Sequence, residues 1–315
     1  MLRAMKHSTT RRHPRRPPAL QTGDRVALVA PAGPVTEARI ASALAQCAYF
    51  GLEPVLGQAA GRKVGFLAGT DSERLADLDR AFRDPGIAAV WALRGGYGTM
   101  RLLAALAPPE HPRLYLGFSD NTAVHLWLLK HGLVAFHGPH AGAELPPLSE
   151  LCLRRVAFQA EAAGELPLPA AGPPPVTLVP GRAEGRLVGG NLALVAALCG
   201  TPWQPSARGR LLFIEDVGEP GYRVDRFLRQ LQLAGVLEGV AGLVGGQFTQ
   251  CGTAEETAEV QDTVREFAVG LGVPAVLGFP IGHDPDNWTL PLGVRARLDA
   301  DAGTLSLLEP AVEHR

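Results

Sequence analysis

The first half of the chain alternates short apolar runs with longer segments whose apolar residues recur at helical spacing. The apolar runs predict buried strands, and the segments between them predict helices. In chain order, these predicted elements are residues 25–30, 35–50, 70–83, 87–93, 114–117 and 120–130. Such alternation predicts an α/β fold with a doubly wound parallel sheet, whose ligand crevice lies beyond the carboxyl ends of the strands.

The second half mixes strands and helices less regularly. Residues 161–181 contain six prolines and few charges, which predicts a linker between domains. Beyond it, apolar and helical segments favour a smaller domain of mixed β/α structure. Its predicted elements are residues 185–188, 191–199, 210–214, 222–233, 240–246, 253–269, 274–279 and 294–298. The expected organisation is a tail (1–23), an N-terminal domain (24–160), the linker (161–181) and a C-terminal domain (182–315).

Length and charge agree with a two-domain protein that carries a basic head. A chain of 315 residues exceeds the usual size of one core. The net charge of −1 hides six basic residues and no acidic residue within positions 1–20. We expect a disordered tail there and no nucleic-acid partner, although contact with RNA or an anionic surface is an alternative. Neither an export signal nor a membrane-spanning apolar run is recognisable, so a cytoplasmic location is expected.

Metal and nucleotide chemistry are not expected. The four cysteines are widely separated, and no HExxH pair occurs. His137 and His140 flank a proline, which argues against a helix that would direct both at one metal ion. In the glycine loop at residues 94–98, a dinucleotide fingerprint would require a third glycine where Arg101 stands. We therefore expect no metal and no cofactor.

Ser119 lies where an apolar run passes into a helix, within Gly-Phe-Ser-Asp-Asn. This resembles the strand, tight turn and helix that expose the nucleophile of α/β hydrolases, although Asn121 replaces the usual second glycine. Capping of the helix by Ser119 or Asp120 is the alternative interpretation. Glycines after the preceding strand favour the nucleophile, because backbone amides of Gly96 and Asp120 could then form an oxyanion hole.

An acid and a base for such a nucleophile occur in the second half. Glu215 follows a strongly apolar run, with Asp216 and Glu219 as alternative acids. His283 lies in a loop after Gly282, where a solvent-facing or locally hydrogen-bonded histidine is the alternative. Ser119, Glu215 and His283 together would form a nucleophilic triad across the two halves.

The joint pattern resembles the LD-carboxypeptidase family of serine peptidases, which includes muramoyltetrapeptide carboxypeptidases and microcin immunity proteins. The resemblance runs from about residue 24 to 308. It rests on motifs at residues 93–98, 117–122, 137–139, 189–192, 200–202 and 212–217, on Tyr222, Asp225 and Arg226, and on residues 282–283 and 287–293. It implies an N-terminal domain similar to class I glutamine amidotransferases and an active site between the domains.

The resemblance also implies a function. It assigns Ser119, Glu215 and His283 to the triad and the amides of Gly96 and Asp120 to the oxyanion hole. The implied reaction removes the terminal D-alanine from murein tetrapeptides during peptidoglycan recycling, without metal, in a homodimer. A microcin-immunity hydrolase of aminoacyl or peptidyl nucleotide amides is one alternative, with Trp288 as a nucleobase clamp or, as we prefer, a packing residue. A non-catalytic ligand-binding protein is another. The residue that binds the substrate carboxylate stays open.

Overall fold

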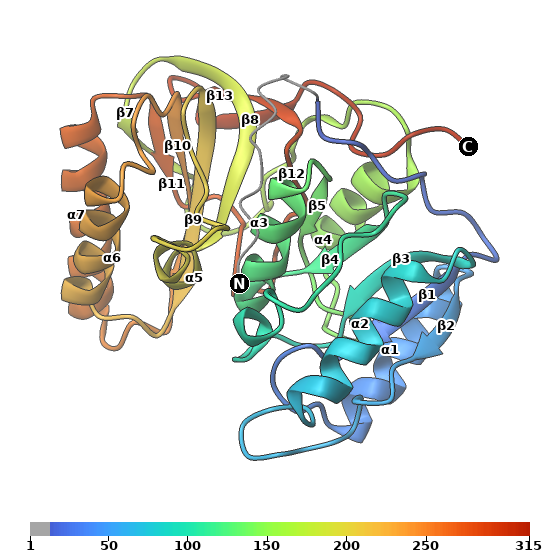
Figure 1. The fold of residues 1–315 in the computed structure, drawn as a ribbon. Helices are drawn as coiled ribbons and strands as arrows, with labels where there is room; N and C mark the ends of the chain where they lie inside the picture. Colours follow the sequence, from blue (N-terminus) through green and yellow to red (C-terminus); the bar gives the residue numbers. More distant parts are fainter. Residues whose placement is uncertain (1–12) are drawn as a thin grey trace.

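Two β-sheets organise the chain in the computed structural model, which describes residues 13–315 (Figure 1). The N-terminal sheet has the strand order β12-β5-β4-β3-β1-β2. Its strands are β1 (Arg25–Val29), β2 (Glu53–Leu56), β3 (Ile87–Ala92), β4 (Leu114–Gly117), β5 (Ala135–His137) and β12 (Leu290–Leu292). Strands β1 to β5 are parallel, and β12 is antiparallel to β5. The predicted α/β class and parallel sheet are therefore confirmed.

Three helices lie where the apolar spacing predicts them: α1 (Glu37–Tyr49), α2 (Asp71–Arg83) and α3 (Thr122–Lys130). A fourth, α4 (Pro147–Leu153), follows β5 and was not predicted. Thr70 and Glu73 form a reciprocal capping box, which explains why α2 begins at Asp71. After the glycine loop the chain makes a short 3₁₀ turn, Thr99–Arg101. Leu102 and Leu106 are buried in the core.

The C-terminal sheet has eight strands in the order β6-β14-β13-β8-β9-β10-β11-β7. They are β6 (Gly164–Glu165), β7 (Val176–Val179), β8 (Arg182–Asn191), β9 (Arg210–Val217), β10 (Gly242–Thr249), β11 (Ala275–Leu277), β13 (Arg295–Asp299) and β14 (Thr304–Leu307). Strands β8 to β11 are parallel, whereas β6, β7, β13 and β14 pair antiparallel with their neighbours. Of its helices α5 (Leu192–Ala197), α6 (Gly221–Leu233) and α7 (Ala254–Leu271), α6 and α7 lie on the outer side in Figure 1, away from the N-terminal sheet.

Two segments expected to lack structure are ordered. Part of the tail, residues 13–23, packs on the body: the amide of Ala19 donates to Glu313 O at 2.9 Å, and the side chains of Ala19 and Leu20 are buried. The basic residues Arg3, Lys6, Arg11 and Arg12 lie outside the described residues. The expected linker contributes β6 and β7 to opposite edges of the C-terminal sheet. The six prolines lie between and just after these two strands, so none of them interrupts a strand.

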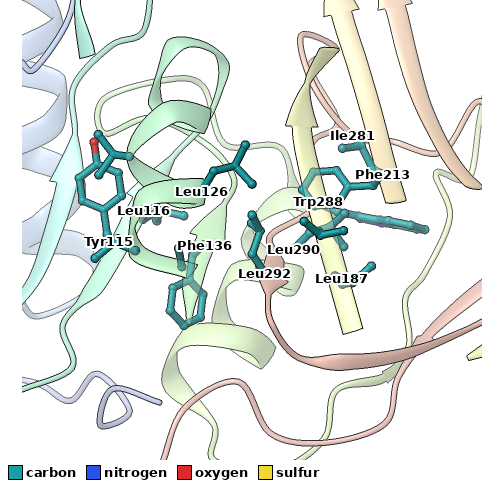
Figure 2. Packing of buried hydrophobic residues seen from close by; sticks show 14 of the residues in the cluster. Tyr115, Leu116, Leu126, Phe136, Leu187, Phe213, Ile281, Trp288, Leu290 and Leu292 are labelled. Atoms are coloured by element: carbon teal, nitrogen blue, oxygen red, sulfur yellow. The ribbon is translucent and has the colours of Figure 1, made fainter. Parts of the chain in front are cut away.

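One stretch of chain joins the two sheets. After β12 pairs with β5, the amide of Gly293 donates to Leu187 O at 2.8 Å, and Leu187 N donates to Val294 O at 2.9 Å, so the chain passes directly from one sheet to the other. Figure 2 shows Leu290 and Leu292 between Leu126 of α3 and Leu187 of β8. A continuous apolar core therefore runs through both halves. No helix within residues 13–315 has the length and apolar content needed to cross a bilayer.

This connection predicts that residues 13–160 do not fold well alone. Without β12, the β5 edge would be left unpaired, and unpaired edges promote aggregation. We expect this fragment to elute as aggregate in size-exclusion chromatography, and co-expression with residues 161–315 to restore a complex with one copy of each. A monodisperse, cooperatively melting 13–160 fragment would contradict the structural role given to β12.

Candidate active site

The turn at Ser119 is strained. Ser119 has a φ of 61°, a left-handed conformation that is uncommon for residues other than glycine and that clusters at functional sites. The Asn121 side chain braces the turn, donating to Phe118 O at 3.1 Å and to Arg94 O at 3.3 Å. No side-chain hydrogen bond caps α3, so the capping interpretation of Ser119 and Asp120 is wrong.

The glycine loop packs directly against this turn. A Cβ atom at Gly95 would lie 2.8 Å from Ser119 Cβ, so only glycine fits there. Thr99 N donates to Asp120 Oδ2 at 2.8 Å, which fastens the loop to the residue after the serine. Burial raises the pKa of Asp120, while the hydrogen bonds from Thr99 oppose that shift. Among the residues that the structure describes, neither Gly96 N nor Asp120 N has a hydrogen-bond acceptor, so both amides are available to a ligand.

The predicted acid and base are hydrogen-bonded to each other. His283 Nδ1 lies 2.8 Å from Glu215 Oε2, and the Glu215 side chain is fully buried at the end region of β9. The imidazole is 18% exposed and is therefore reachable from the crevice. Glycine at position 282 makes room for this pair, since a Cβ there would lie 2.3 Å from Glu215 Oε2.

The alternative acids have other partners. Asp216 accepts a hydrogen bond from Asn191 Nδ2 at 2.8 Å, and burial raises the pKa of this carboxyl to about 6. Glu219 forms an ion pair with Arg223 at 2.8 Å. Neither carboxylate bonds to His283 in the described part of the chain. The structure thus selects Glu215 as the partner of the imidazole.

The His283 loop is held against the serine turn. The ring of His283 contacts that of Phe118, which precedes Ser119, with centroids 4.8 Å apart. Ser149 Oγ on α4 accepts a hydrogen bond from Asn287 N at 2.8 Å, which ties the loop to the N-terminal half. The structure shows no hydrogen bond between Ser119 Oγ and His283 within residues 13–315. The structure nevertheless brings the three predicted side chains to one seam, which is the boundary between the N-terminal and C-terminal halves. The hydrogen bond between Glu215 and His283 is formed there.

Three buried histidines line the rear of this seam. His140 Nε2 lies 3.1 Å from both Phe118 O and Asn121 Nδ2, so the ring supports the serine turn. His137 and His125 are fully buried, and their ring nitrogens lack partners within the described residues. Burial lowers the pKa of both His137 and His140 to about 3, which keeps these imidazoles neutral. Within residues 13–315, no cluster of histidine, cysteine and acidic side chains is arranged to hold a metal ion.

A strained serine after a parallel strand, two available amides and a carboxylate-bound imidazole are typical of serine hydrolases on α/β folds. The model of the LD-carboxypeptidase N-terminal domain matches residues 26–138, and that of the LD-carboxypeptidase C-terminal domain matches residues 184–298. The chain therefore belongs to the LD-carboxypeptidase family.

Relatives of this chain carry consistent names. A murein tetrapeptide carboxypeptidase of Pseudomonas aeruginosa is 36% identical over 292 residues, covering 88% of this chain and 94% of the relative. A probable murein peptide carboxypeptidase of Bacillus subtilis is 37% identical over 295 residues, covering 90% and 91%. Among solved structures, a muramoyltetrapeptide carboxypeptidase of Oxalobacter formigenes superposes with a TM-score of 0.78 at 32% identity, covering 92% and 99%.

The microcin immunity protein MccF has the same fold. Its complex with glutamyl sulfamoyl guanosine superposes with a TM-score of 0.84 over 95% of this chain and 99% of the other, at 23% identity. This likeness establishes the two-domain α/β architecture. It adds nothing about the substrate of this chain.

Gly282→Ala should disable the acid and base pair. Its Cβ would collide with Glu215, so the carboxylate and imidazole must separate. Gly278→Ala is the matched control, because Gly278 also has a positive φ, of 98°, but its Cβ would meet only Pro175 Cα at 3.7 Å. Backbone strain of about 1–2 kcal/mol is common to both variants. We expect the rate of fluorophosphonate labelling of Ser119 to fall about 100-fold in the first variant alone. Equal rates in both would contradict the role given to Gly282.

The buried histidines predict a stability that decreases on acidification. The unfolded chain binds protons below about pH 6.5, whereas folded His137 and His140 stay neutral until about pH 3. Each therefore contributes stability that is present above pH 6.5 and is lost as the pH falls, by about 1.4 kcal/mol per pH unit.

His137→Phe should remove one such contribution. We expect the slope of unfolding free energy against pH, measured by urea denaturation between about pH 4.5 and 6.5, to decrease by about 1.4 kcal/mol per unit. His111→Phe, at an exposed position, serves as the control. An unchanged slope in the His137 variant would contradict this prediction, because it would show that the His137 imidazole is protonated in the folded protein over the same pH range as in the unfolded chain.

Proposed function

We propose that this protein is a serine LD-carboxypeptidase that hydrolyses the terminal D-alanine from murein tetrapeptides. The observation that carries the proposal is the 2.8 Å hydrogen bond between His283 and Glu215 beside the strained Ser119. The name of the 36% identical Pseudomonas relative supports the substrate class.

In the first half of the reaction, Ser119 Oγ attacks the amide carbonyl before the terminal D-residue. His283 Nε2 accepts the serine proton, while Glu215 fixes the tautomer through Nδ1 and stabilises the imidazolium. The amides of Gly96 and Asp120 donate to the oxyanion of the tetrahedral intermediate. We expect the Ser119–His283 hydrogen bond to form when substrate fills the crevice, as catalytic bonds commonly shorten on binding.

The second half regenerates the enzyme. His283 gives its proton to the amine of D-alanine, the C–N bond breaks, and the acyl group remains on Ser119 as an ester. Water, deprotonated by His283, then attacks this ester. His283 returns the proton to Ser119 Oγ as the ester C–O bond breaks, which releases the tripeptide. All proton transfers are assigned to the triad, so the scheme requires no cofactor.

Hydrolysis of aminoacyl nucleotide amides is the rival reaction in the same family. The E. coli MccF protein is 26% identical to this chain over 291 residues, a lower identity than the 36% of the Pseudomonas murein enzyme. Trp288, the expected nucleobase clamp, is fully buried and donates from Nε1 to Pro167 O at 2.8 Å. Its ring therefore serves packing, which favours the peptide substrate. Incubation with tetrapeptide and aminoacyl sulfamoyl adenosine side by side would separate the two reactions.

A homodimer stays a prediction from the family resemblance, and a cytoplasmic location stays a prediction from the sequence pattern. Cell fractionation and sedimentation velocity would test them.

The other alternative, a non-catalytic ligand-binding protein, is opposed by the intact Glu215–His283 pair. Labelling by a fluorophosphonate that is lost in Ser119→Ala would argue directly against it.

Substitution of the triad tests the proposal. Wild-type protein should convert tetrapeptide to tripeptide with a mass loss of one alanine residue. Ser119→Ala and His283→Ala should each reduce kcat by about 10⁵-fold or more, and Glu215→Gln by about 10²- to 10⁴-fold, because triad members act as a unit. Turnover is followed by mass spectrometry.

Ser206→Ala is the matched control for these variants, since Ser206 is exposed and, within the described residues, its hydroxyl bonds to Arg208 N and to no member of the triad. Its turnover should equal that of wild type. Wild-type turnover in Ser119→Ala would defeat the assignment of the nucleophile. The absence of alanine release from the wild-type protein would defeat the assignment of the substrate.

A further inference from the structure

Two arginines without an acidic partner flank the loop that carries the Gly96 amide. Arg39 lies in the first turn of α1, and its buried Nη1 has no hydrogen-bond partner within residues 13–315. Arg94 follows β3, and its guanidinium donates from Nη1 to Pro34 O at 2.9 Å. Neither forms an ion pair in the described chain, and residues 1–12 contain no aspartate or glutamate that could supply one.

Arg94 lies one layer of backbone from the nucleophile. Its Nε is 3.7 Å from where a Cβ of Gly33 would stand, and Gly33 N donates to Gly95 O at 3.1 Å. Gly95 in turn packs against Ser119, since a Cβ there would lie 3.0 Å from Ser119 Oγ. Arg94 Nε and Gly96 are therefore both neighbours of Gly33, since a Cβ of Gly96 would lie 3.5 Å from Gly33 Cα.

Arg39 approaches the same region from α1. Its Cδ lies 2.9 Å from where a Cβ of Gly142 would stand, and the neighbouring His140 contacts Phe118 O behind the serine turn. The N-terminus of α1, capped by Thr36, adds a partial positive charge next to the two guanidinium groups. Glu37 in the same turn offsets this partial charge, so the two guanidinium groups are the main sources of positive potential next to the segment between β1 and α1.

This concentration of positive charge is unfavourable in the protein alone. Burial lowers the pKa of Arg39, and the charge of Arg94 lowers it further. A half-buried guanidinium normally acquires a carboxylate or a full set of hydrogen bonds. An anionic ligand would supply both, and the planar fork of an arginine matches a carboxylate well.

We propose that Arg39 and Arg94 bind the free α-carboxylate of the C-terminal D-residue of the substrate. This inference rests on the proposed carboxypeptidase function, and it explains how the enzyme recognises the end of a peptide. A peptide whose terminal carboxylate pairs with these arginines has its last amide bond next to Ser119. An amidated or extended peptide would leave both cations unpaired.

Binding measurements on an inactive background separate this inference from the reaction. In Ser119→Ala, calorimetry should show that the tetrapeptide acid binds about 10- to 100-fold more tightly than the tetrapeptide amide, the range expected for a hydrogen-bonded charge pair. Arg39→Gln and Arg94→Gln, each added to Ser119→Ala, should weaken binding of the acid and bring the ratio of acid to amide close to one. Binding of the amide should change little.

Two further variants act as controls. Arg62→Gln removes a guanidinium from the neighbouring loop that is already paired with Glu73, so the ratio of acid to amide should match that of the parent. Arg94→Lys should retain part of the preference, because it keeps the charge but loses the planar fork. The midpoint temperature of thermal unfolding of ligand-free Arg39→Gln should be no lower than that of the parent, because no native ion pair is lost.

The inference is overturned if Ser119→Ala shows no preference for the acid, or if both arginine variants keep the parent preference. Should Arg39→Gln fail to fold, Arg94→Gln decides, since the Arg94 side chain is exposed. Failure of the proposed function has a different signature, namely wild-type protein that releases no alanine from the tetrapeptide acid.

Discussion

The antiparallel pairing of β12 with β5 is the constraint on which the site depends. Leu290 pairs with His137 and Leu292 with Ala135, next to the strand that leads into Ser119. Because His283 lies shortly before β12 in the chain, this pairing limits how far the imidazole can move from the serine turn. The hydrogen bond from Asn287 N to Ser149 fixes the same loop a second time. The catalytic seam is thus closed by the fold, and the apolar core that runs through both sheets stabilises it.

The serine turn shows how backbone strain is held in place. A left-handed Ser119 is unfavourable by about 1–3 kcal/mol, so surrounding contacts must determine it. Asn121 and Thr99 supply hydrogen bonds. Gly95 leaves room for Ser119, which a side chain at position 95 would take up. The absence of a second glycine from this turn is therefore compatible with a nucleophile, because an asparagine amide takes over part of the support.

Much of this was predictable from sequence, and the failures have physical causes. Each candidate side chain follows an apolar run, so Ser119, Glu215 and His283 could be proposed individually. The choice of Glu215 over Asp216 came from the family resemblance and could not be made from the apolar pattern, because adjacent residues on a strand face opposite sides and only their partners reveal which side holds the imidazole. Strand β12 was missed because it has three residues, including a proline, and pairs with a strand more than 150 positions earlier.

The charged groups near Ser119 have different partners, and under the proposed function this difference decides how a substrate lies. The carboxylate of Glu215 bonds to His283, whereas Arg94 lies next to Gly33 and the Nη1 of Arg39 has no hydrogen-bond partner within the described residues. An exopeptidase must hold the chain end about one residue, or ~3.8 Å between Cα atoms, from the bond that it breaks. Gly95 separates Arg94 from Gly96 in sequence and touches Ser119 in space. Under the proposal, an anionic terminus bound at the arginines places the last peptide bond next to Ser119 and the proposed oxyanion amides, and the opposite orientation would place it away from them.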